Sequence, residues 1–185
     1  MNKEIVLSSV AEALEMKSRL VRQAEEAVRA VQAIAASKQT AIDTICALKF
    51  ERVIDDRLFD EKLNFIEYLN QTFTYLVCLT AGIHLLKESP ERPVTIRFGI
   101  AAGYDVEAGG GKLIGECFAA TSVKSNSKLK NDLLRLQANH VAQEKYAFFY
   151  TRSTSVDQTY IGKMRLRYPG ITLVEFSYKE LTEIS

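Results

Sequence analysis

The sequence predicts an α/β protein in which a helical N-terminal extension precedes a core with a central mixed sheet flanked by helices. Apolar residues recur at helical spacing through the first third of the chain. Beyond it, the dipeptide Gly110-Gly111 separates two segments with strand character, and residues 146–150 (Tyr-Ala-Phe-Phe-Tyr) have the composition of a buried strand. Helical and strand segments therefore follow one another along the second part of the chain.

The first predicted helix carries two rows of apolar residues over residues 10–35. One row steps by four and three and is interrupted only by Lys17, while the other recurs every seven residues. The stripe is wider than a two-stranded coiled coil needs, so the later helices or a second copy of the chain must cover it. Because exposed apolar patches mark interfaces, we predict a homodimer formed through these N-terminal helices. The rows are Val10, Leu14, Val21, Ala24, Val28, Val31 and Ala35, and Ala13, Leu20, Ala27 and Ile34.

Two more helices are predicted before the sheet begins, over residues 40–53 and 59–87, with Pro90 and Pro93 ending the helical region. The second of them is apolar almost all round, which is typical of a central buried helix. We therefore divide the chain into a helical extension, residues 1–58, which is a candidate dimerisation region, and an α/β core, residues 59–185.

The glycine turn pairs two carboxylates. If Gly110 and Gly111 form a two-residue hairpin turn, Asp105 lies directly opposite Glu116 on the same face of the sheet. Like charges in that arrangement are destabilising, so they are either exposed to water or used to hold a cation. Mg²⁺ is the natural candidate, since it prefers oxygen ligands and is held by one or two carboxylates together with waters and phosphates.

The rest of the chain supplies two more helices and two more strands. A helix begins near Ser125, with a Ser or Asn as its N-cap and with Leu129, Leu133 and Leu136 at helical spacing. The strand over residues 146–150 follows, then a short helix over residues 156–168 and a last strand over residues 171–176.

The predicted elements follow the order helix, strand, strand hairpin, helix, strand, with an Asp on the second strand and a Glu on the third. This arrangement resembles the PD-(D/E)XK nuclease superfamily. The resemblance covers residues 59–176 and implies a restriction-endonuclease-like core. It implies that Asp105 is the metal-binding Asp and that Glu116 is the acid of the (D/E)XK tripeptide. It also makes Glu67 of the first core helix a candidate metal ligand, although a Glu on the polar face of a packed helix is commonly just solvated.

The tripeptide departs from the family pattern. It is Glu116-Cys117-Phe118, so Phe118 stands where the family places its catalytic Lys. Some members of the superfamily supply the Lys from a neighbouring element, and Lys124, Lys128 or Lys130 could do so here. Without such a replacement the chain would be a catalytically inactive relative kept for binding.

Basic residues gather in one part of the chain, although the whole chain has a net charge of only +1. Residues 124–167 hold nine Lys or Arg against three acids, a net charge of +6, which leaves −5 for the remainder. Such a region could contact phosphates, and a solvated helix face explains it equally well. The candidate nucleic-acid-binding residues are Lys124, Lys128, Lys130, Arg135, Arg152, Lys163, Arg165 and Arg167.

These observations predict a nuclease, dependent on Mg²⁺ or Mn²⁺, that hydrolyses phosphodiester bonds in nucleic acid, with DNA the expected substrate. The alternatives are an inactive nuclease-like protein that binds nucleic acid or serves in assembly, and a helical oligomerisation protein. We expect a cytoplasmic location and no membrane partner. No apolar run has the length of a membrane helix, the N-terminus lacks a signal-peptide pattern, and Cys46, Cys78 and Cys117 are odd in number and far apart.

Overall fold

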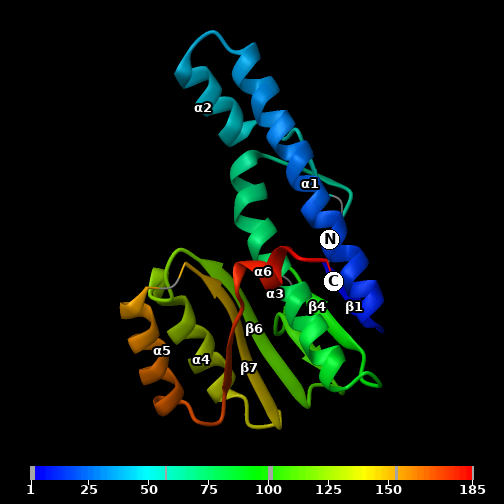
Figure 1. Cartoon of the computed structure of the whole chain (residues 1–185), viewed down its shortest axis with the longest axis vertical. Coiled ribbons are helices and arrows are strands. Elements are labelled where there is room, and N and C mark those ends of the chain that lie inside the picture. Colours follow the sequence, from blue (N-terminus) through cyan, green and yellow to red (C-terminus); the bar gives the residue numbers. More distant parts are fainter. Residues whose placement is uncertain (1–2, 57, 100–101, 153, 185) are drawn as a thin grey trace.

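The computed structural model describes residues 3–56, 58–99, 102–152 and 154–184 and has two visibly different parts (Figure 1). A body contains a six-stranded sheet flanked by helices, and an arm of helices projects from it. The mixed α/β class predicted from the sequence is confirmed. Within the described ranges, no helix is both long and apolar enough to cross a membrane.

The sheet changes from antiparallel to parallel pairing at its centre. Neighbours are antiparallel from the first strand to the fourth, and the last three strands are parallel. Parallel neighbours need crossover connections, and the helices α4 (Lys128–Ala138) and α5 (Ser155–Arg167) provide them. In spatial order the strands are β1 (Glu4–Leu7), β4 (Val94–Arg97), β5 (Val106–Ala108), β6 (Leu113–Ala120), β7 (Glu144–Thr151) and β8 (Thr172–Glu175).

The hairpin between β5 and β6 has the predicted register. Val106 pairs with Gly115 and Ala108 with Leu113, and extending this pairing by one residue sets Asp105 opposite Glu116. The turn needs glycine, because Gly110 and Gly111 have φ values of 65° and 84° in the left-handed region. The pairing of β6 with β5 ends at Gly115, whereas its pairing with β7 continues to Ala120. The second half of β6 therefore has β7 as its neighbour on one side and no pairing with β5 on the other.

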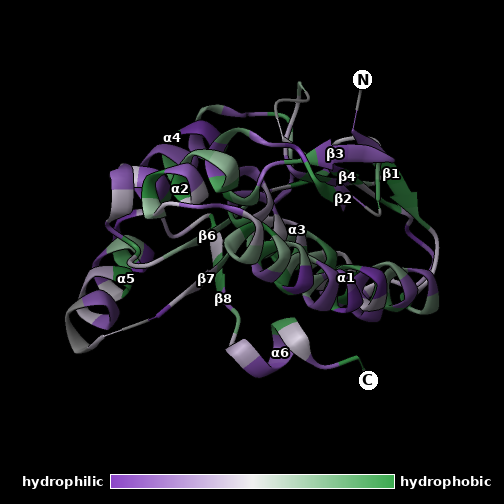
Figure 2. Ribbon diagram, turned by 90° about the horizontal axis from the view of Figure 1, so that it is seen from above, coloured by the Kyte–Doolittle hydropathy of each residue, from purple (hydrophilic) through white to green (hydrophobic). Residues whose placement is uncertain are grey.

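Each face of the sheet has its own apolar core. On β6 the side chain of Cys117 packs in the core that contains α3 (Phe65–Glu88) and α6 (Tyr178–Thr182), whereas Phe118 packs in the core beneath α4 and α5. This alternation follows from the two-residue period of a strand. Figure 2 shows α4 and α6 on opposite sides of β6 and β7.

The arm consists of α1 (Val10–Ser37), α2 (Ala41–Phe50), the first part of α3 and a small hairpin of β2 (Ile54–Asp56) and β3 (Glu61–Leu63). Figure 2 shows α1 lying alongside α3, and the two helices pack together. A separate small core joins these elements at the base of the arm. Its buried members are Ala27, Ile54, Leu63 and Tyr68.

The predicted stripe on α1 is covered only in part. The row that recurs every seven residues, Ala13, Leu20, Ala27 and Ile34, is buried by elements of the same chain. Lys17 is buried as well, because its ammonium group donates a hydrogen bond to the carbonyl of Glu180 in α6. On the other row, Ala24 and Ala35 are exposed, and Val28 is 55% exposed.

Three expectations are corrected. The division at residue 58 is not a physical boundary, because β1 pairs with β4 in the main sheet and the β2–β3 hairpin lies on both sides of that point. The helix expected over residues 59–87 begins at Phe65, since residues 61–63 form β3. No Ser or Asn side chain caps α4: Ser127 holds the N-cap position without a side-chain bond, directly after the turn η1 (Ser125–Ser127).

Candidate functional site

The carboxyl groups of Asp105 and Glu116 meet at the point where β5 leaves β6, as the register predicts. They lie within hydrogen-bonding reach of each other, and the backbone N–H of Cys117 donates to Oδ2 of Asp105 over 2.8 Å. The Glu116 side chain is only 1% exposed, although it is an acid on a strand. Glu116 of β6, which is buried, thus pairs with Asp105, which directly precedes β5 and is partly buried.

Burial, and after it the charge of Asp105, raises the pKa of Glu116 to about 8. The main counter-charge is Arg135 of α4, whose Nη1 lies 2.7 Å from Oε1 of Glu116. That approach lacks hydrogen-bonding geometry, so the buried oxygen has an ion-pair partner and no hydrogen bond. The guanidinium group of Arg135 also lies 4.8 Å from the centre of the Tyr104 ring.

A second acid and a lysine stand beside the pair, both on α4. Nζ of Lys128 donates to Oδ1 of Asp132 over 2.7 Å, while Oδ2 of Asp132 is buried without a hydrogen bond. Burial raises the pKa of Asp132 to about 6, and Lys128 opposes this rise. Burial disfavours the charge of Lys128, but its bond to Asp132 and the nearby Asp105 and Glu116 outweigh burial and raise its pKa.

A cavity of about 410 Å³ lies beside these groups, although Glu116, Asp132 and Arg135 do not line it. Asp105 and Lys128 both line it, and Phe118 forms part of its wall. The helix α3 closes the cavity on another side with a row of polar side chains that includes Gln71 and Thr74. Besides apolar residues, the space is therefore bounded by a carboxylate, a lysine, neutral polar groups and Arg97, which is itself paired with Glu4 and Glu107. A carboxylate and a lysine are groups that can hold a hydrated cation and a phosphate.

The backbone is strained where α4 meets the cavity. Asn126 and Ser127 both lie in the left-handed region, with φ values of 50° and 54°. Such positions cost on the order of 1 kcal/mol or more for residues other than glycine, and they concentrate at functional sites. Here the strained turn immediately precedes Lys128 and thereby sets where that side chain enters the cavity.

The layer behind the acids is apolar and uncharged. The thiols of Cys78 on α3 and Cys117 on β6 are within hydrogen-bonding reach of each other, and both residues are buried. Burial raises the pKa of the Cys117 thiol well above its usual value, so it stays neutral. The two neutral thiols therefore form part of the cavity wall beside Asp105.

Of the three lysines expected near the acids, the structure brings only Lys128 to the cavity. Nζ of Lys124 lies 5.6 Å from the centre of the Tyr160 ring on α5. Lys130 is exposed on α4 and does not line the cavity. Position along the chain could not separate the three lysines, because which of them enters the cavity depends on the left-handed turn at Asn126 and Ser127.

The other basic candidates are dispersed. Arg152 follows β7 and lines a second cavity beside the first. Lys163, Arg165 and Arg167 lie in the second half of α5, which runs back for about 18 Å from Ser155 at 1.5 Å per residue. Those three are therefore not part of the cavity end of the sheet, and Arg135 is engaged by Glu116.

Glu67 stabilises the start of α3 and does not belong to the acid site. It completes the capping box with Asn64 at the start of α3 and pairs with Arg52, whose Nη2 lies 2.9 Å from Oε1. It precedes Cys78, which faces Cys117, by eleven residues, or about 16 Å along the helix axis. The acid pair and Glu67 are thus not brought together.

Phe118 is a core residue as well as a wall of the cavity. It is 3% exposed, and its ring stacks on Phe149 with the centroids 5.4 Å apart. A lysine at this position would leave its stem in the core beneath α4. The position where the nuclease resemblance expects a lysine is therefore filled by a packed aromatic side chain.

The possible metal ligands are carboxylate oxygens, which suit a hard cation, but only two residues provide them. Asp105 and Glu116 provide carboxylate oxygens, one of them buried without a hydrogen bond, and magnesium needs only one or two carboxylates. Across the described ranges, no group of three or more His, Cys, Asp or Glu side chains is arranged to hold a metal ion. The sequence reasoning missed Asp132, whose spacing of four from Lys128 was the available signal.

The search among known proteins returned no match to this chain: no protein-family model, no curated protein and no solved structure resembles it.

Proposed function

We propose that this protein is a metal-dependent nuclease whose centre is Asp105 and Glu116. The observation that carries the proposal is the contact of the buried Glu116 carboxyl group with that of Asp105, which lines a cavity together with Lys128. Two acids from facing strands are costly to bury together, and a bound divalent cation would offset that cost. The element order α3, β4, β5, β6, α4, β7 is also the order that the nuclease resemblance implies.

The chain's own residues have distinct roles in this proposal. Asp105 and Glu116 would hold Mg²⁺ or Mn²⁺, which when bound supplies charge stabilisation at the phosphate and a more acidic water. Lys128 would replace the missing lysine and hold a phosphate oxygen of the substrate in the cavity. Asp132 holds the Lys128 ammonium group in place, and Arg135 balances Glu116 until a cation binds.

Non-catalytic nucleic-acid binding on the same scaffold is a second candidate. Two observations favour it: Arg135 already neutralises Glu116, and Phe118 occupies the place of the usual lysine. In that case the cluster would be a structural remnant and Lys128 a phosphate contact. The two candidates differ in one measurable property, which is turnover.

Cleavage assays separate the candidates. Purified protein is incubated with single-stranded and duplex DNA and RNA in the presence of Mg²⁺, Mn²⁺ or EDTA. We expect cleavage with either metal, none in EDTA, and loss of cleavage in Asp105→Asn and Glu116→Gln. Binding of nucleic acid without cleavage of any substrate in either metal would establish the second candidate instead.

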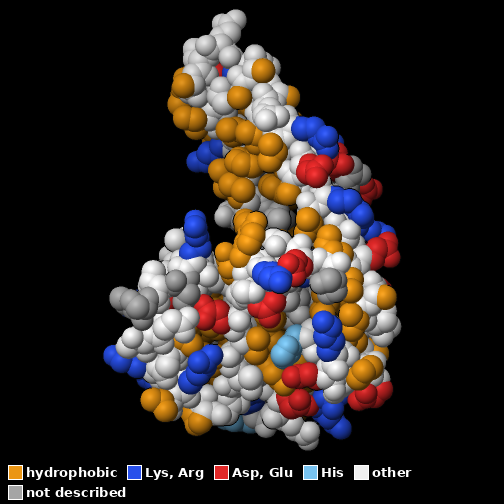
Figure 3. Space-filling model, viewed as in Figure 1, with side chains coloured by type: hydrophobic (Ala, Val, Ile, Leu, Met, Phe, Trp, Pro, Cys, Tyr) orange, Lys and Arg blue, Asp and Glu red, His pale blue; other side chains and the backbone are white. Residues whose placement is uncertain are grey.

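Assembly is a separate proposal. Large apolar side chains are exposed along the arm, and Figure 3 shows them gathered over α2 and the first part of α3. We propose a homodimer through this arm in the cytoplasm, a reducing compartment that suits the three free cysteines. A monomeric mass in light scattering would refute it. The residues are Val28, Ile42, Ile45, Phe50, Val53 and Ile66.

A further inference from the structure

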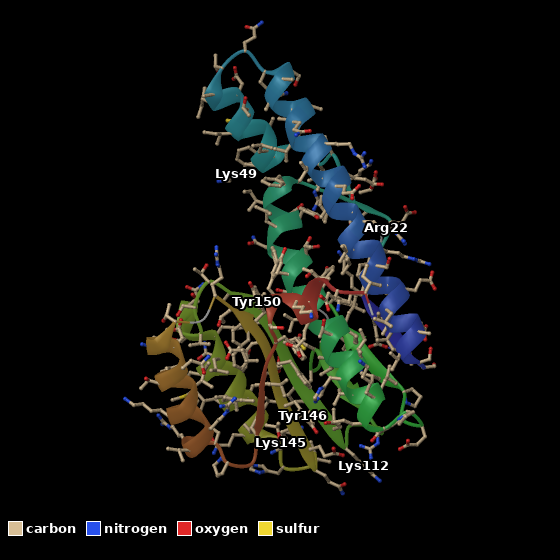
Figure 4. All side chains as sticks on the ribbon, viewed as in Figure 1. Arg22, Lys49, Lys112, Lys145, Tyr146 and Tyr150 are labelled. Atoms are coloured by element: carbon tan, nitrogen blue, oxygen red, sulfur yellow. The ribbon has the colours of Figure 1, made fainter. Side chains whose placement is uncertain are left out.

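A second, larger cavity of about 630 Å³ adjoins the acid site. The two cavities share Asn70 of α3 and Ala119 and Ala120 at the end of β6, so they form one continuous groove. The larger cavity contains none of the acids. It extends the site across the end of β7 towards α6, where Figure 4 places Tyr150.

Three aromatic rings line this cavity. Tyr150 stacks on Phe73 with centroids 6.3 Å apart and planes inclined by 16°, and it lies 6.4 Å from the ring of Tyr178. The rings are accessible: Phe73 is 38% exposed and Tyr178 is 61% exposed. Aromatic residues from α3, β7 and α6 therefore converge on one open space without filling it.

The cavity also has polar groups at its edge. Arg152, which is exposed, follows Tyr150 by two residues and lines the same space, and Asn70 stands between the two cavities. A planar apolar group can stack on the rings while a negative charge meets the guanidinium group. Nucleobases and backbone phosphates alternate in this way along a single strand, whereas the bases of a duplex are hidden in their stack.

We propose that this groove binds an unpaired nucleotide, so that the substrate of the acid site is a single-stranded nucleic acid or a single-stranded end. The proposal rests on the nuclease function proposed above, whose acid site the groove adjoins. A base lies against Tyr178, Tyr150 and Phe73, and the neighbouring phosphate meets Arg152. The strand then passes Asn70 and enters the cavity of Asp105 and Lys128.

The test measures binding without metal, so that its outcome does not depend on cleavage. A short fluorescent single strand of mixed sequence, the same sequence as RNA, and the blunt DNA duplex are titrated in EDTA and followed by anisotropy. We expect at least one single strand to bind about fivefold or more tightly than the duplex. Equal or tighter binding of the duplex, or no binding of either single strand, overturns the proposal.

Variants locate the binding. Tyr178→Ala changes an exposed side chain and should weaken single-strand binding by about fivefold or more, as should Tyr150→Leu. The control is Tyr146→Leu, which alters the same strand at its opposite end (Figure 4) and should leave binding unchanged. If Tyr178→Ala and a folded Tyr150→Leu both bind like the wild type, the groove is not the binding site.

The charge contact has its own readout. Arg152→Gln should remove one phosphate contact. The magnitude of the slope of log affinity against log salt concentration should therefore fall by about 0.7, the value for one contact to a single strand. Arg22→Gln, on the outer side of α1 (Figure 4), is the matched control and should leave the slope unchanged. An unchanged slope in Arg152→Gln contradicts the phosphate contact. Absence of cleavage with binding intact would count against the nuclease function alone.

Discussion

The two ends of β6 and β7 carry similar kinds of side chain, but these side chains differ in burial and in the size of the cavities beside them. Where β7 begins, Glu144 pairs with Arg92 over 2.7 Å with both side chains partly in water, and the cavity that both residues line has a volume of only about 10 Å³. Towards the opposite end, Glu116 is buried beside another acid, and two cavities open there. The charges at the first end are partly solvated, whereas at the other end Glu116 and Asp132 each have an ion-pair partner and also a buried oxygen without a hydrogen bond.

The same contrast applies to the aromatic residues. Tyr146 packs on Phe148, with ring planes inclined by 5°, at the closed end of β7, and Tyr150 lines a cavity at the open end (Figure 4). Both residues point to the same face of the strand, so the difference comes from what surrounds them. The proposed function belongs to the open end, where the cavities lie, and the following experiments test this difference between the two ends.

The largest effect is expected from the acids. Asp105→Asn and Glu116→Gln should each lower metal-dependent cleavage by about a thousandfold or more, because each removes a charged ligand from the proposed cation. Glu144→Gln at the closed end is the matched control and should keep the wild-type rate. Equal rates in all three variants would remove the acid pair from the mechanism.

Lys128 should come next. Lys128→Gln is expected to lower cleavage by about a hundredfold, in the range observed for loss of a charged group that contacts the reacting centre. Lys124→Gln and Lys130→Gln should have little effect, because neither side chain lines the cavity. A larger loss in Lys124→Gln than in Lys128→Gln would show that the wrong lysine has been assigned.

The stability of the metal-free protein should depend on pH through Glu116. Its pKa is raised from 4.5 to about 8, so the folded state holds a proton that the unfolded state loses, and stability falls as pH rises between those values. We expect a loss of roughly 2 kcal/mol or more, since each pKa unit is worth about 1.4 kcal/mol. Urea unfolding at several pH values measures it.

Two variants check that assignment. Glu116→Gln cannot ionise and should flatten the pH dependence between about pH 6 and pH 8, above the raised pKa of Asp132, whereas Glu144→Gln should retain it. Added Mg²⁺ should stabilise the wild type more at the upper end of this range than at the lower end, because the cation competes with the proton. A wild type whose stability rises from pH 5 to pH 8 contradicts the buried acid pair.

The smallest effect concerns the hairpin that positions the acids. A Cβ on Gly115 would lie 2.6 Å from Cγ2 of Val106 and 3.2 Å from Cε2 of Phe148. Gly115→Ala should therefore push β5 from β6 and cost about 1 to 3 kcal/mol on unfolding. Gly162→Ala on α5 meets nothing within 4 Å and serves as the control. Equal stability of the two variants would mean that the hairpin adjusts without strain.

The sequence predicted those parts of the fold that local chemistry determines. The glycine turn predicted the register of β5 and β6, apolar spacing located α1 and α4 to within a few residues, and the helix expected over residues 156–168 corresponds to α5. It missed β1, because four residues with a partner nearly ninety positions away leave no local signal. It also missed β2 and β3, whose three-residue strands are stabilised by the arm.

The candidate site, like the fold, could be predicted from the sequence only where residues close in the chain determine it. Asp105 and Glu116 were found because a turn joins them, whereas Asp132 and the aromatic groove depend on how α4, β7 and α6 meet in space. The choice of Lys128 over Lys124 and Lys130 depends on the left-handed turn at Asn126 and Ser127, where no glycine signals such a conformation. The distribution of charge along the chain did not locate the basic residues of the site, because most basic residues of α5 lie away from the cavities.

The most direct test is a crystal of the protein soaked in Mn²⁺ and examined by anomalous scattering. The proposed function predicts one strong peak between the carboxylates of Asp105 and Glu116, with the guanidinium group of Arg135 displaced from Oε1 of Glu116. It also predicts that the peak is missing in Glu116→Gln soaked in the same way. A wild-type map without a peak at that position, with Arg135 still paired to Glu116, would contradict the metal centre.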